Sequence, residues 1–367
     1  MTAISSAGET QRESRRRLLT GVAGIGVLAV AFVLGLAWAK WIPYAHKADR
    51  LSVTHAWPGH VLFAHSGAPG TAPTLAGSWH FAAAYFTEVW EGFLAALVIA
   101  AVLDALVPRA WLLKIMNRRT RLGQAAAGGV AALPSLMCTC CTSPLVVGLR
   151  RRGASATASL AYWLANPLLN PAVLVFLFLV APWQFGVVRI VIGVAIVTGG
   201  PLLVTRLLPR VPADDAVPAE PRREQAVEDP ASLTEFPVRF ARSFARLAIF
   251  LIPAYVAVVL LLGCVSGWLS DFSGLDARLG IIAVLLCAFI GTLLVIPTGG
   301  EIPVVLALTA AGASAATAGA LLITLPALSL PSMVMVGRSL SWRVTAATAA
   351  TVTAAGLAAA ALLWALT

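Results

Sequence analysis

Nine long apolar runs, separated by shorter polar segments, dominate the chain. Each run is longer than the roughly 18 residues that mark a transmembrane helix. The runs cover residues 18–39, 81–107, 122–149, 154–180, 185–208, 247–269, 280–308, 313–337 and 344–366. This pattern predicts an all-α, polytopic membrane protein.

Composition supports a membrane protein and excludes a soluble globule. Of the 367 residues, 59% are hydrophobic and 11% are charged, whereas a soluble domain has roughly 25% charged residues. The formal net charge of +10 comes from basic residues that lie between the apolar runs and do not form one continuous face. The charge is therefore a signal of topology, and it does not indicate nucleic-acid binding.

The first run predicts a plasma-membrane anchor with a cytoplasmic N-terminus. Four arginines precede it at 12, 15, 16 and 17, and positive charge favours the cytoplasmic side. The run is longer than the roughly 7–15 apolar residues of a cleaved signal peptide. Segment 40–80 is then expected outside. It holds all five histidines, which we expect to be exposed and not to form a metal site: His46, His55, His60, His65 and His80.

Two runs are predicted to enter the membrane and return on the same side. Run 122–149 has basic clusters at both ends, so a single crossing would place one cluster outside. Pro134 and Pro144 also interrupt it, and proline breaks a helix interior. Run 280–308, broken between Pro297 and Pro303, is predicted to enter from the outside. In this topology, 21 of the 26 Lys and Arg residues are cytoplasmic, and Lys40 lies outside.

The chain contains an internal repeat at an offset of 159 residues. Ten of the 26 positions from Pro144 to Leu169 are identical to their counterparts, including a Gly-Ala-Ser-Ala block at Gly153 and Gly312. The two predicted hairpins enter from opposite sides, so the repeat is inverted. Inverted repeats with broken helices at the midplane are typical of secondary transporters.

The sequence is therefore divided into five parts. They are a cytoplasmic tail and N-terminal transmembrane anchor (1–39), a His-containing extracytoplasmic segment (40–80), a first permease repeat (81–208), a charged, Pro-rich cytoplasmic linker with an interfacial helix (209–246) and a second permease repeat (247–367).

Three of the five cysteines, Cys138, Cys140 and Cys141, lie at the first break. Thiolates bind soft ions and, by the same argument, trivalent arsenic. A closed zinc site needs four ligands, and no apolar run contains histidine, so we expect transient metalloid ligands and no resident cofactor. An alternative is a thiol oxidoreductase, because Cys138 and Cys141 have C-x-x-C spacing.

Glu301 is the acidic residue at the second break and aligns with Thr142 in the repeat. An ionisable group inside a membrane is a candidate for proton relay, although Glu301 could instead cap the returning half-helix. Thr142 and Thr298, at the two breaks, are further candidates for substrate binding. Asn166 and Asn170 share one helical face, where they would line a polar cavity or connect helices.

These motifs resemble one known family. Cys138-Thr139-Cys140-Cys141-Thr142-Ser143-Pro144, Gly153-Ala154-Ser155 and Asn166-Pro167, with their second-half counterparts from Ile302 to Pro326, are similar to the predicted-permease family that includes the organoarsenical efflux permeases. The similarity covers roughly 81–366, and Cys141 adds a vicinal thiol to the Cys-Thr-Cys pattern. The resemblance implies export of trivalent arsenicals or other soft thiophilic species, driven by an ion gradient.

The leading hypothesis is a secondary-active exporter of a small inorganic or organometalloid substrate. Under this hypothesis the protein is not an enzyme. Cys138, Cys140 and Cys141 would bind the metalloid, and Glu301 would couple transport to protons. The alternatives are a permease for another metal or small solute, the thiol oxidoreductase, and a non-transporting membrane subunit. The expected partners are the lipid bilayer and the substrate, and no nucleic acid is expected. The sequence does not determine the oligomeric state, and a homo-oligomer is one possibility.

Overall fold

The computed structural model describes residues 22–57, 74–106, 109–208, 236–269 and 280–367, and within them the chain is helical and has no strand. The all-α class is confirmed. The first helix, Val22–Thr54, includes η1 (Ala37–Trp41) and α2 (Ile42–Thr54). The helices that follow are α3 (Leu75–Leu106), α4 (Arg109–Met116), α5 (Arg121–Ala132), η3 (Leu133–Ser135), α6 (Thr139–Arg151), α7 (Ala156–Leu168), α8 (Pro171–Val180), α9 (Trp183–Leu207), α10 (Phe236–Leu269), α12 (Ile281–Leu293), α13 (Glu301–Ala310), α14 (Ala315–Ala327), α15 (Leu330–Leu340) and α16 (Trp342–Leu366).

Helix lengths and surface chemistry agree with a polytopic membrane protein. Six helices among the described residues are long and apolar enough to span a membrane, and the bent pair α14–α15 makes a seventh if it counts as one span. Large apolar side chains such as Ile249 and Leu285 point outward and are 75% and 49% exposed. An apolar exterior of this kind suits contact with lipid.

The first helix is longer than expected from the sequence. It runs from Val22 to Thr54 and does not end at Ala39. Its middle, η1, is a turn of π-helix. The polar residues after Ala39 extend the helix because neither proline nor glycine interrupts them before Pro43, which the helix accommodates at the start of α2. His60, His65 and the linker 209–235 lie outside the described residues.

The basic segment 238–246 is the first part of α10 and not a separate interfacial helix. No proline or glycine lies between Val238 and Ile252 to end the helix. At this end of the molecule, Ser243 Oγ donates to Asp104 Oδ2 at 2.7 Å, and Asp104 Oδ1 lies 3.4 Å from Arg152 Nε. The start of α10 is thus joined to the end of α3.

The repeat extends over whole helices. At the offset of 159 residues, α7 falls on the bounds of α14 and α9 falls on the bounds of α16. The helices α3, α5, α6 and α8 match α10, α12, α13 and α15 to within a few residues at each end. One succession of helices and breaks therefore occurs twice.

The shared Gly-Ala-Ser-Ala block explains why the halves turn alike. Gly153 and Gly312 have φ of 88° and 87°, a left-handed conformation that glycine adopts without strain. Two residues later, the Ser155 and Ser314 hydroxyls accept hydrogen bonds from the backbone N–H groups of Ala158 and Thr317 and cap α7 and α14. The same three residues thus end one helix and begin the next in both halves.

The first hairpin, α5–α6, returns to the side from which it enters. Asn117, which precedes α5, donates through Nδ2 to the Gly153 carbonyl at 3.0 Å and accepts from the Ser155 N–H at 2.7 Å. Gly153 and Ser155 follow α6, so both ends of the hairpin lie together. The break at η3 therefore lies at the inner tip of the hairpin, as predicted.

The second hairpin, α12–α13, has the same form. Val284 and Ala316, near the starts of α12 and α14, pack in one apolar cluster. Gly291 and Thr324, near the ends of these two helices, are also in contact range. Because α12 and α14 run in the same direction, α13 between them must run back.

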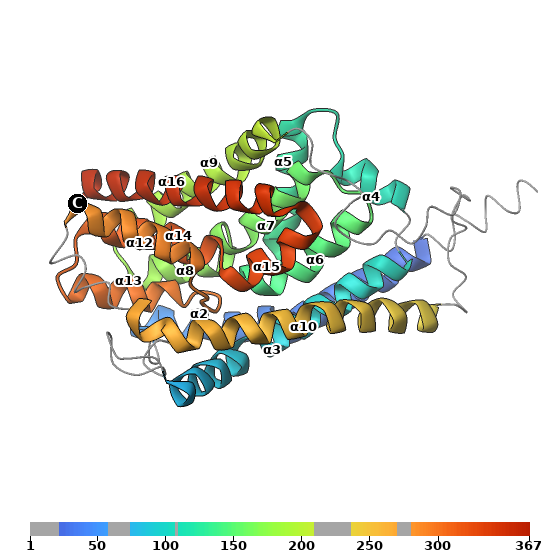
Figure 1. The fold of residues 1–367 in the computed structure, drawn as a ribbon, viewed down its shortest axis with the longest axis horizontal. Coiled ribbons are helices and arrows are strands. Elements are labelled where there is room, and N and C mark those ends of the chain that lie inside the picture. Colours follow the sequence, from blue (N-terminus) through green and yellow to red (C-terminus); the bar gives the residue numbers. More distant parts are fainter. Residues whose placement is uncertain (1–21, 58–73, 107–108, 209–235, 270–279) are drawn as a thin grey trace, which may run out of the picture.

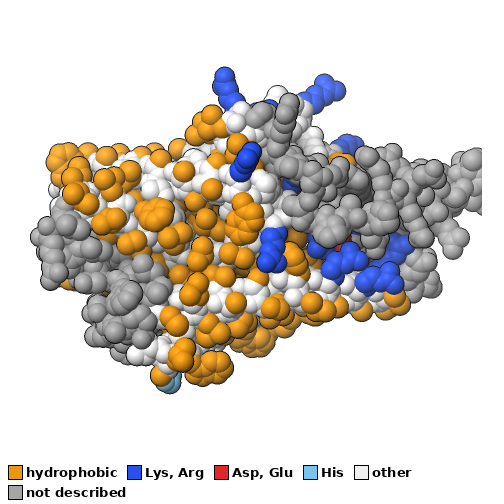
Figure 2. Space-filling view, viewed as in Figure 1, with side chains coloured by type: hydrophobic (Ala, Val, Ile, Leu, Met, Phe, Trp, Pro, Cys, Tyr) orange, Lys and Arg blue, Asp and Glu red, His pale blue; other side chains and the backbone are white. Residues whose placement is uncertain are grey.

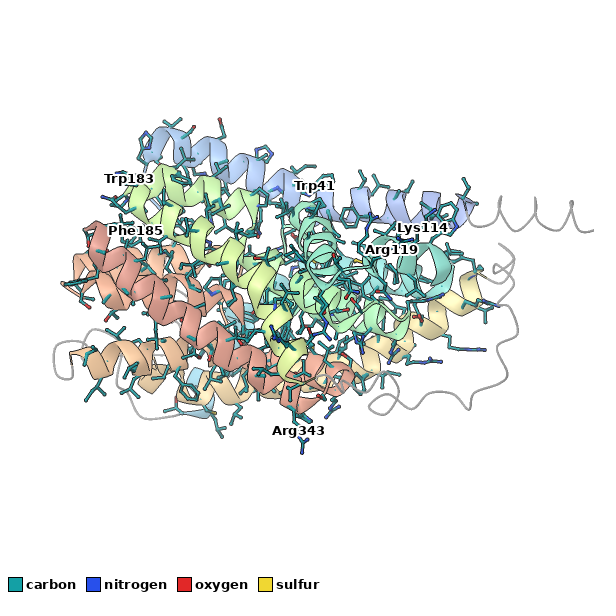
Figure 3. The ribbon with its side chains drawn as sticks, turned by 90° about the horizontal axis from the view of Figure 1, so that it is seen from above. Trp41, Lys114, Arg119, Trp183, Phe185 and Arg343 are labelled. Carbon is teal, nitrogen blue, oxygen red and sulfur yellow. The ribbon has the colours of Figure 1, made fainter. Side chains whose placement is uncertain are left out.

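The two hairpins lie toward opposite ends of the molecule. In Figure 1, α4, which leads into the first hairpin, lies to the right along the long axis, whereas α12 and α13 lie at the left end beside the C-terminus. Lys and Arg side chains gather on the α5 side in the view of Figure 2. Figure 3 places Lys114 and Arg119 toward that end, Trp183 and Phe185 at the far end, and Trp41 between them. The repeat is therefore inverted, with its breaks facing the middle.

Candidate functional site

The first break turns the chain so that a new helix begins at the cysteines. Leu136 adopts a left-handed conformation with φ 50°, and Cys138 is the extended N-cap residue of α6. The first N–H groups of a helix have no partners within the helix and carry a partial positive charge. The sulfur atoms therefore lie at the positive end of a buried half-helix.

Cys138 and Cys141 form a pair, whereas Cys140 has other partners. The Cys138 and Cys141 sulfurs are 3.2 Å apart. The Cys140 sulfur lies 3.1 Å from Ser329 Oγ and accepts from the Tyr85 hydroxyl at 3.5 Å. Among the described residues, no three His, Cys, Asp or Glu side chains are arranged to hold a metal ion. The Cys138 and Cys141 sulfurs are thus in direct contact, and Cys140 lies beside Cys138 with further partners of its own.

Thr142 lies beside these thiols, but its hydroxyl is engaged with its own helix. It donates to the Cys138 carbonyl at 2.9 Å, and Ser143 makes the same bond to the Thr139 carbonyl. These bonds hold the first turn of α6 together. Because both hydroxyls are engaged with the backbone, the cysteine sulfurs are the groups in this turn that could bind a soft ion.

The second break faces the first across a small cavity. The cavity has a volume of about 10 Å³, which is space for about one water molecule, and it is lined by Cys138, Pro167, Ile296, Pro297, Thr298, Gly299, Glu301 and Pro326. The repeat pairs Cys138 with Pro297 and Pro167 with Pro326. Thr298 contributes a buried hydroxyl without a hydrogen-bond partner. Both breaks therefore line one small cavity, as the inverted repeat predicts.

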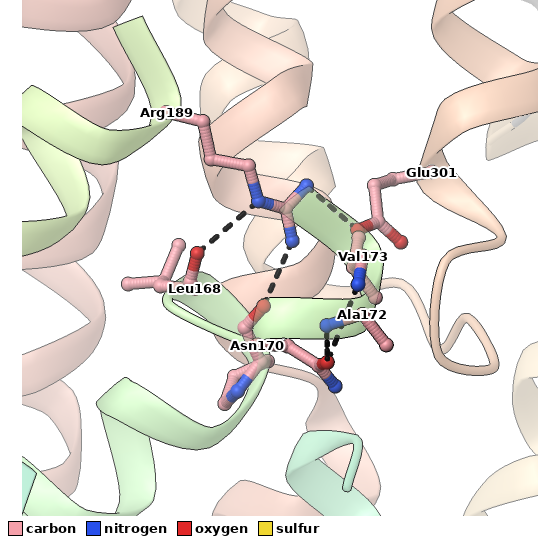
Figure 4. Close-up of polar contacts among 7 residues, drawn as sticks. Leu168, Asn170, Ala172, Val173, Arg189 and Glu301 are labelled. Atoms are coloured by element: carbon pink, nitrogen blue, oxygen red, sulfur yellow. Dashed lines mark hydrogen bonds and ion pairs between the residues drawn. The ribbon is translucent and has the colours of Figure 1, made fainter. Parts of the chain in front are cut away.

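Glu301 begins α13 and forms a buried ion pair with Arg189. The carboxylate Oε1 lies 2.7 Å from Arg189 Nη1, and both side chains are at most 2% exposed. Arg189, on α9, also donates to the Pro167 carbonyl at 2.8 Å and the Leu168 carbonyl at 3.2 Å. Figure 4 shows the guanidinium between these carbonyls and the carboxylate. The pair joins the end of α7 in the first repeat to the second break.

Arg189 lies within the apolar run 185–208, and the sequence alone assigns it no role. The available signal was its position, because an arginine within an apolar run needs a partner in the membrane interior. The partner lies 112 residues further along the chain. The pairing of Arg189 with Glu301 therefore depended on the tertiary fold.

The two asparagines connect and cap helices around the cavity. The Asn166 side chain bonds to Ser135 Oγ in η3 through Oδ1 and donates to the Tyr162 carbonyl at 3.1 Å. Asn170 Oδ1 accepts from the Ala172 and Val173 N–H groups at 3.1 and 3.3 Å and caps α8. Neither belongs to the cavity lining, although Asn170 Nδ2 is buried without a partner. Ser329, the repeat counterpart of Asn170, reaches the thiol cluster instead.

Lys40 reaches the cysteine pair from the first helix, a contact that sequence reasoning missed. It is 5% exposed and donates to the Tyr44 hydroxyl at 3.3 Å. A Cβ added at Gly92 would lie 3.1 Å from Lys40 Nζ and 3.4 Å from the Cys141 sulfur. The expectation that Lys40 lies outside is therefore wrong, because the helix continues past Ala39 and turns this side chain inward.

Comparison with known proteins places the chain in a family. It matches the model of a family described as "Predicted permease" over residues 74–364. It is 34% identical over 307 residues to the UPF0718 protein YraQ of Escherichia coli (strain K12). This alignment covers 84% of this chain and 85% of the relative. No solved structure matches significantly. The match extends over both repeats and both breaks, and the chain belongs to the predicted permease family.

Proposed function

We propose that this membrane permease is a secondary-active exporter of a soft, thiophilic solute, with trivalent arsenicals as the leading class. The observation that carries the proposal is the Cys138–Cys141 pair. It lies at the tip of a half-helix and faces the second break within an inverted repeat. Half-helix ends that converge near the midplane form the substrate sites of many secondary transporters.

The chemistry of the pair supports a soft solute. Two sulfurs at 3.2 Å can both bond to one trivalent arsenic or one Cu(I), and soft ligands select such centres over hard cations. Cys140 is one residue away and hydrogen-bonded to Ser329. Its contacts with Ser329 and Tyr85 leave Cys138 and Cys141 as the two thiols open to the solute. The resting arrangement thus favours transient binding over a permanent metal site.

Glu301 is the proposed coupling group, and Arg189 is its counter-charge. A proton on Glu301 would leave the Arg189 guanidinium buried without its anion, which is strongly unfavourable. Protonation would therefore favour a second arrangement of α9 and α13. The ion pair is the element through which a proton gradient would act on the two repeats.

The proposed orientation places the N-terminus in the cytoplasm. Basic side chains cluster toward the α5–α6 end, and positive residues favour the cytoplasmic side of a membrane. The first hairpin then opens to the cytoplasm and the second to the outside of the plasma membrane. Solute bound at the cysteine pair would be released outward past the second break.

A thiol oxidoreductase is the second candidate, and the Cys138–Cys141 contact favours it. Two sulfurs at C-x-x-C spacing can cycle through a disulfide. Such a cycle needs an electron acceptor or donor, such as a membrane quinone. The two functions differ in a simple way, because a thiol oxidoreductase would transfer electrons without moving a solute.

Everted membrane vesicles test solute and coupling together. Vesicles with the wild-type protein are offered arsenite, methylated trivalent arsenic, Cu(I) and zinc, with and without an imposed proton gradient. We expect gradient-driven accumulation of a trivalent arsenical. Glu301→Gln should still bind the solute but lose gradient-driven accumulation, whereas Glu88→Gln, an exposed carboxylate on α3, should behave as wild type. Intact proton-driven accumulation in Glu301→Gln would refute the coupling role.

A further inference from the structure

A buried lysine next to the cysteine pair has hydrogen-bond donors to spare. An ammonium group carries three N–H donors. For Lys40 the structure gives one hydrogen bond, to the Tyr44 hydroxyl at 3.3 Å, and the same ring also lies under the ammonium at 5.3 Å. Among the described residues, Lys40 has no carboxylate within ion-pair distance. Buried donors without acceptors are costly, so the position favours an incoming acceptor.

The first helix is shaped to place Lys40 there. Lys40 lies in η1, and π-helical turns inside α-helices frequently occur at functional sites. The next residue, Trp41, donates through Nε1 to the Pro134 carbonyl at 2.8 Å, which anchors the turn to the first break. Gly92 on α3 leaves room for the lysine, because a Cβ there would meet Lys40 Cε at 2.7 Å. Three elements thus bring one ammonium group to Cys141.

We propose that Lys40 is the oxygen-binding half of the solute site, and that it makes the site selective for trivalent oxyacids that keep a hydroxyl after bonding to two thiols. This inference rests on the proposed function, because it assigns the solute's soft centre to Cys138 and Cys141. The first helix lies outside the residues that match the family model, 74–364. Lys40 would therefore be a specificity-determining residue that this chain adds to the common permease unit.

The chemistry distinguishes two kinds of arsenical. When arsenous acid bonds to two thiols, two As–O bonds break and two As–S bonds form. The two thiol protons leave with the two hydroxyls as water, and nothing is oxidised. One hydroxyl stays on the arsenic, and its oxygen can accept from the Lys40 ammonium. A phenyl-substituted trivalent arsenical loses both of its hydroxyls in the same step and keeps no oxygen for Lys40.

The test measures binding to the purified full-length protein in detergent, with a phosphine reductant so that no free thiol competes. Arsenite and phenylarsine oxide are titrated against wild type, Lys40→Met, Lys40→Arg and Lys47→Met. Lys47 lies two turns further along the same helix, over the Trp57 ring at 3.7 Å. We expect Lys40→Met to weaken arsenite binding about tenfold to a hundredfold, the usual effect of losing a hydrogen bond to a charged group. Phenylarsine oxide binding should stay within about threefold, a change of under 1 kcal/mol.

The control variants separate charge and position from general damage. Lys40→Arg keeps a cationic donor and should retain most of the arsenite affinity, and Lys47→Met should match wild type. If Lys40→Met does not fold, Gly92→Ala carries the test, because its Cβ would push the Lys40 side chain from its place. It should weaken arsenite binding and spare phenylarsine oxide. Gly35→Ala, whose Cβ would meet Ala95 Cβ at an ordinary 3.6 Å, should change neither.

The outcomes also separate this inference from the proposed function. Equal losses for both arsenicals in Lys40→Met, or no loss for either, would overturn the role of Lys40 and leave the cysteine site intact. Absence of binding of both arsenicals to wild type would instead refute the cysteine site itself. A selective loss of arsenite binding would support both.

Discussion

At the scale of single residues, two cationic side chains are buried among the residues that the structure describes. Lys40 and Arg189 are 5% and 0% exposed, in a region where an uncompensated charge is expensive. Arg189 is compensated by Glu301 and by two backbone carbonyls. Lys40 has a hydroxyl and two neighbouring thiols. The ammonium group of Lys40 therefore keeps N–H donors that a solute could use, whereas the guanidinium of Arg189 is already paired.

The Arg189–Glu301 pair gives the first prediction, which concerns stability. Arg189→Met removes one partner of a buried pair and should destabilise the protein by about 3–5 kcal/mol, because the remaining carboxylate is left buried without a counter-charge. Thermal unfolding of the detergent-purified protein measures the loss. Arg343→Met, at an exposed position, is the matched control and should unfold as wild type does.

The double variant Arg189→Met with Glu301→Gln decides what causes the loss. Removing both charges should restore much of the stability, because no isolated charge stays buried. A double variant as unstable as Arg189→Met would contradict the ion-pair account. It would show that packing around the arginine stem, and not the charge, is what the single substitution removes.

The positions of candidate site residues were predictable from the sequence where nearby proline and glycine residues determined them. The cysteines and Glu301 were located at breaks because proline and glycine mark breaks directly. The inward position of Lys40 was not predictable, because a lysine after an apolar run reads as the end of a helix. Only the π-turn and the space over Gly92 bring it to Cys141. The position of Arg189 in an apolar run indicated a partner, but the identity of that partner was not predictable, because the pair joins helices from different repeats.

At the scale of elements, small residues set how closely the hairpins approach their neighbours. Gly128 on α5 is the clearest case, because a Cβ there would lie 2.1 Å from the Ala158 carbonyl oxygen on α7. The backbones are in direct contact at this point, as is common between membrane helices. The break at η3 is one turn further along α5. Its distance from α7 therefore depends on this contact.

The contact predicts that Gly128→Ala moves the first hairpin. The added methyl group must push α5 away from backbone that cannot yield, which should cost about 1–3 kcal/mol, as overpacking does elsewhere. Thermal unfolding and arsenical binding should both decline. Gly199→Ala, where a Cβ meets nothing within 4 Å, is the matched control. Equal behaviour of the two variants would mean that α5 is free to shift.

Element boundaries were predicted well where glycine, serine or proline marks them, and poorly where a polar stretch adjoins an apolar run. The Gly-Ala-Ser-Ala turns and the proline breaks placed the hairpins and the kinked helices. By contrast, the first helix continues past its expected end, and α10 begins before its expected start at 247. In each case a polar or basic stretch without a helix breaker extends an apolar helix, and polarity alone does not end a helix.

At the scale of the whole molecule, the inverted repeat predicts which segments face the same side of the membrane. Both ends of the first hairpin should face one side, and the end of the second hairpin should face the other. Single cysteines at Arg119, Arg152 and Ala311, in a background without native cysteines, test this with an impermeant thiol reagent. We expect 119 and 152 to react from the cytoplasmic side and 311 from the outside. Opposite sidedness of 119 and 152 would replace the hairpin with a full span.

The cysteine pair is the centre of the functional account, and arsenical transport by cysteine variants tests it most directly. Accumulation of arsenite and of methylated trivalent arsenic in everted vesicles is compared for wild type, Cys138→Ser, Cys141→Ser, their double variant and Cys264→Ser. Serine nearly preserves shape but is a poor soft ligand. The account predicts that the variants at 138 and 141 are expressed normally and lose transport, while Cys264→Ser, a change on α10, transports as wild type does. Wild-type transport by the double variant would contradict it.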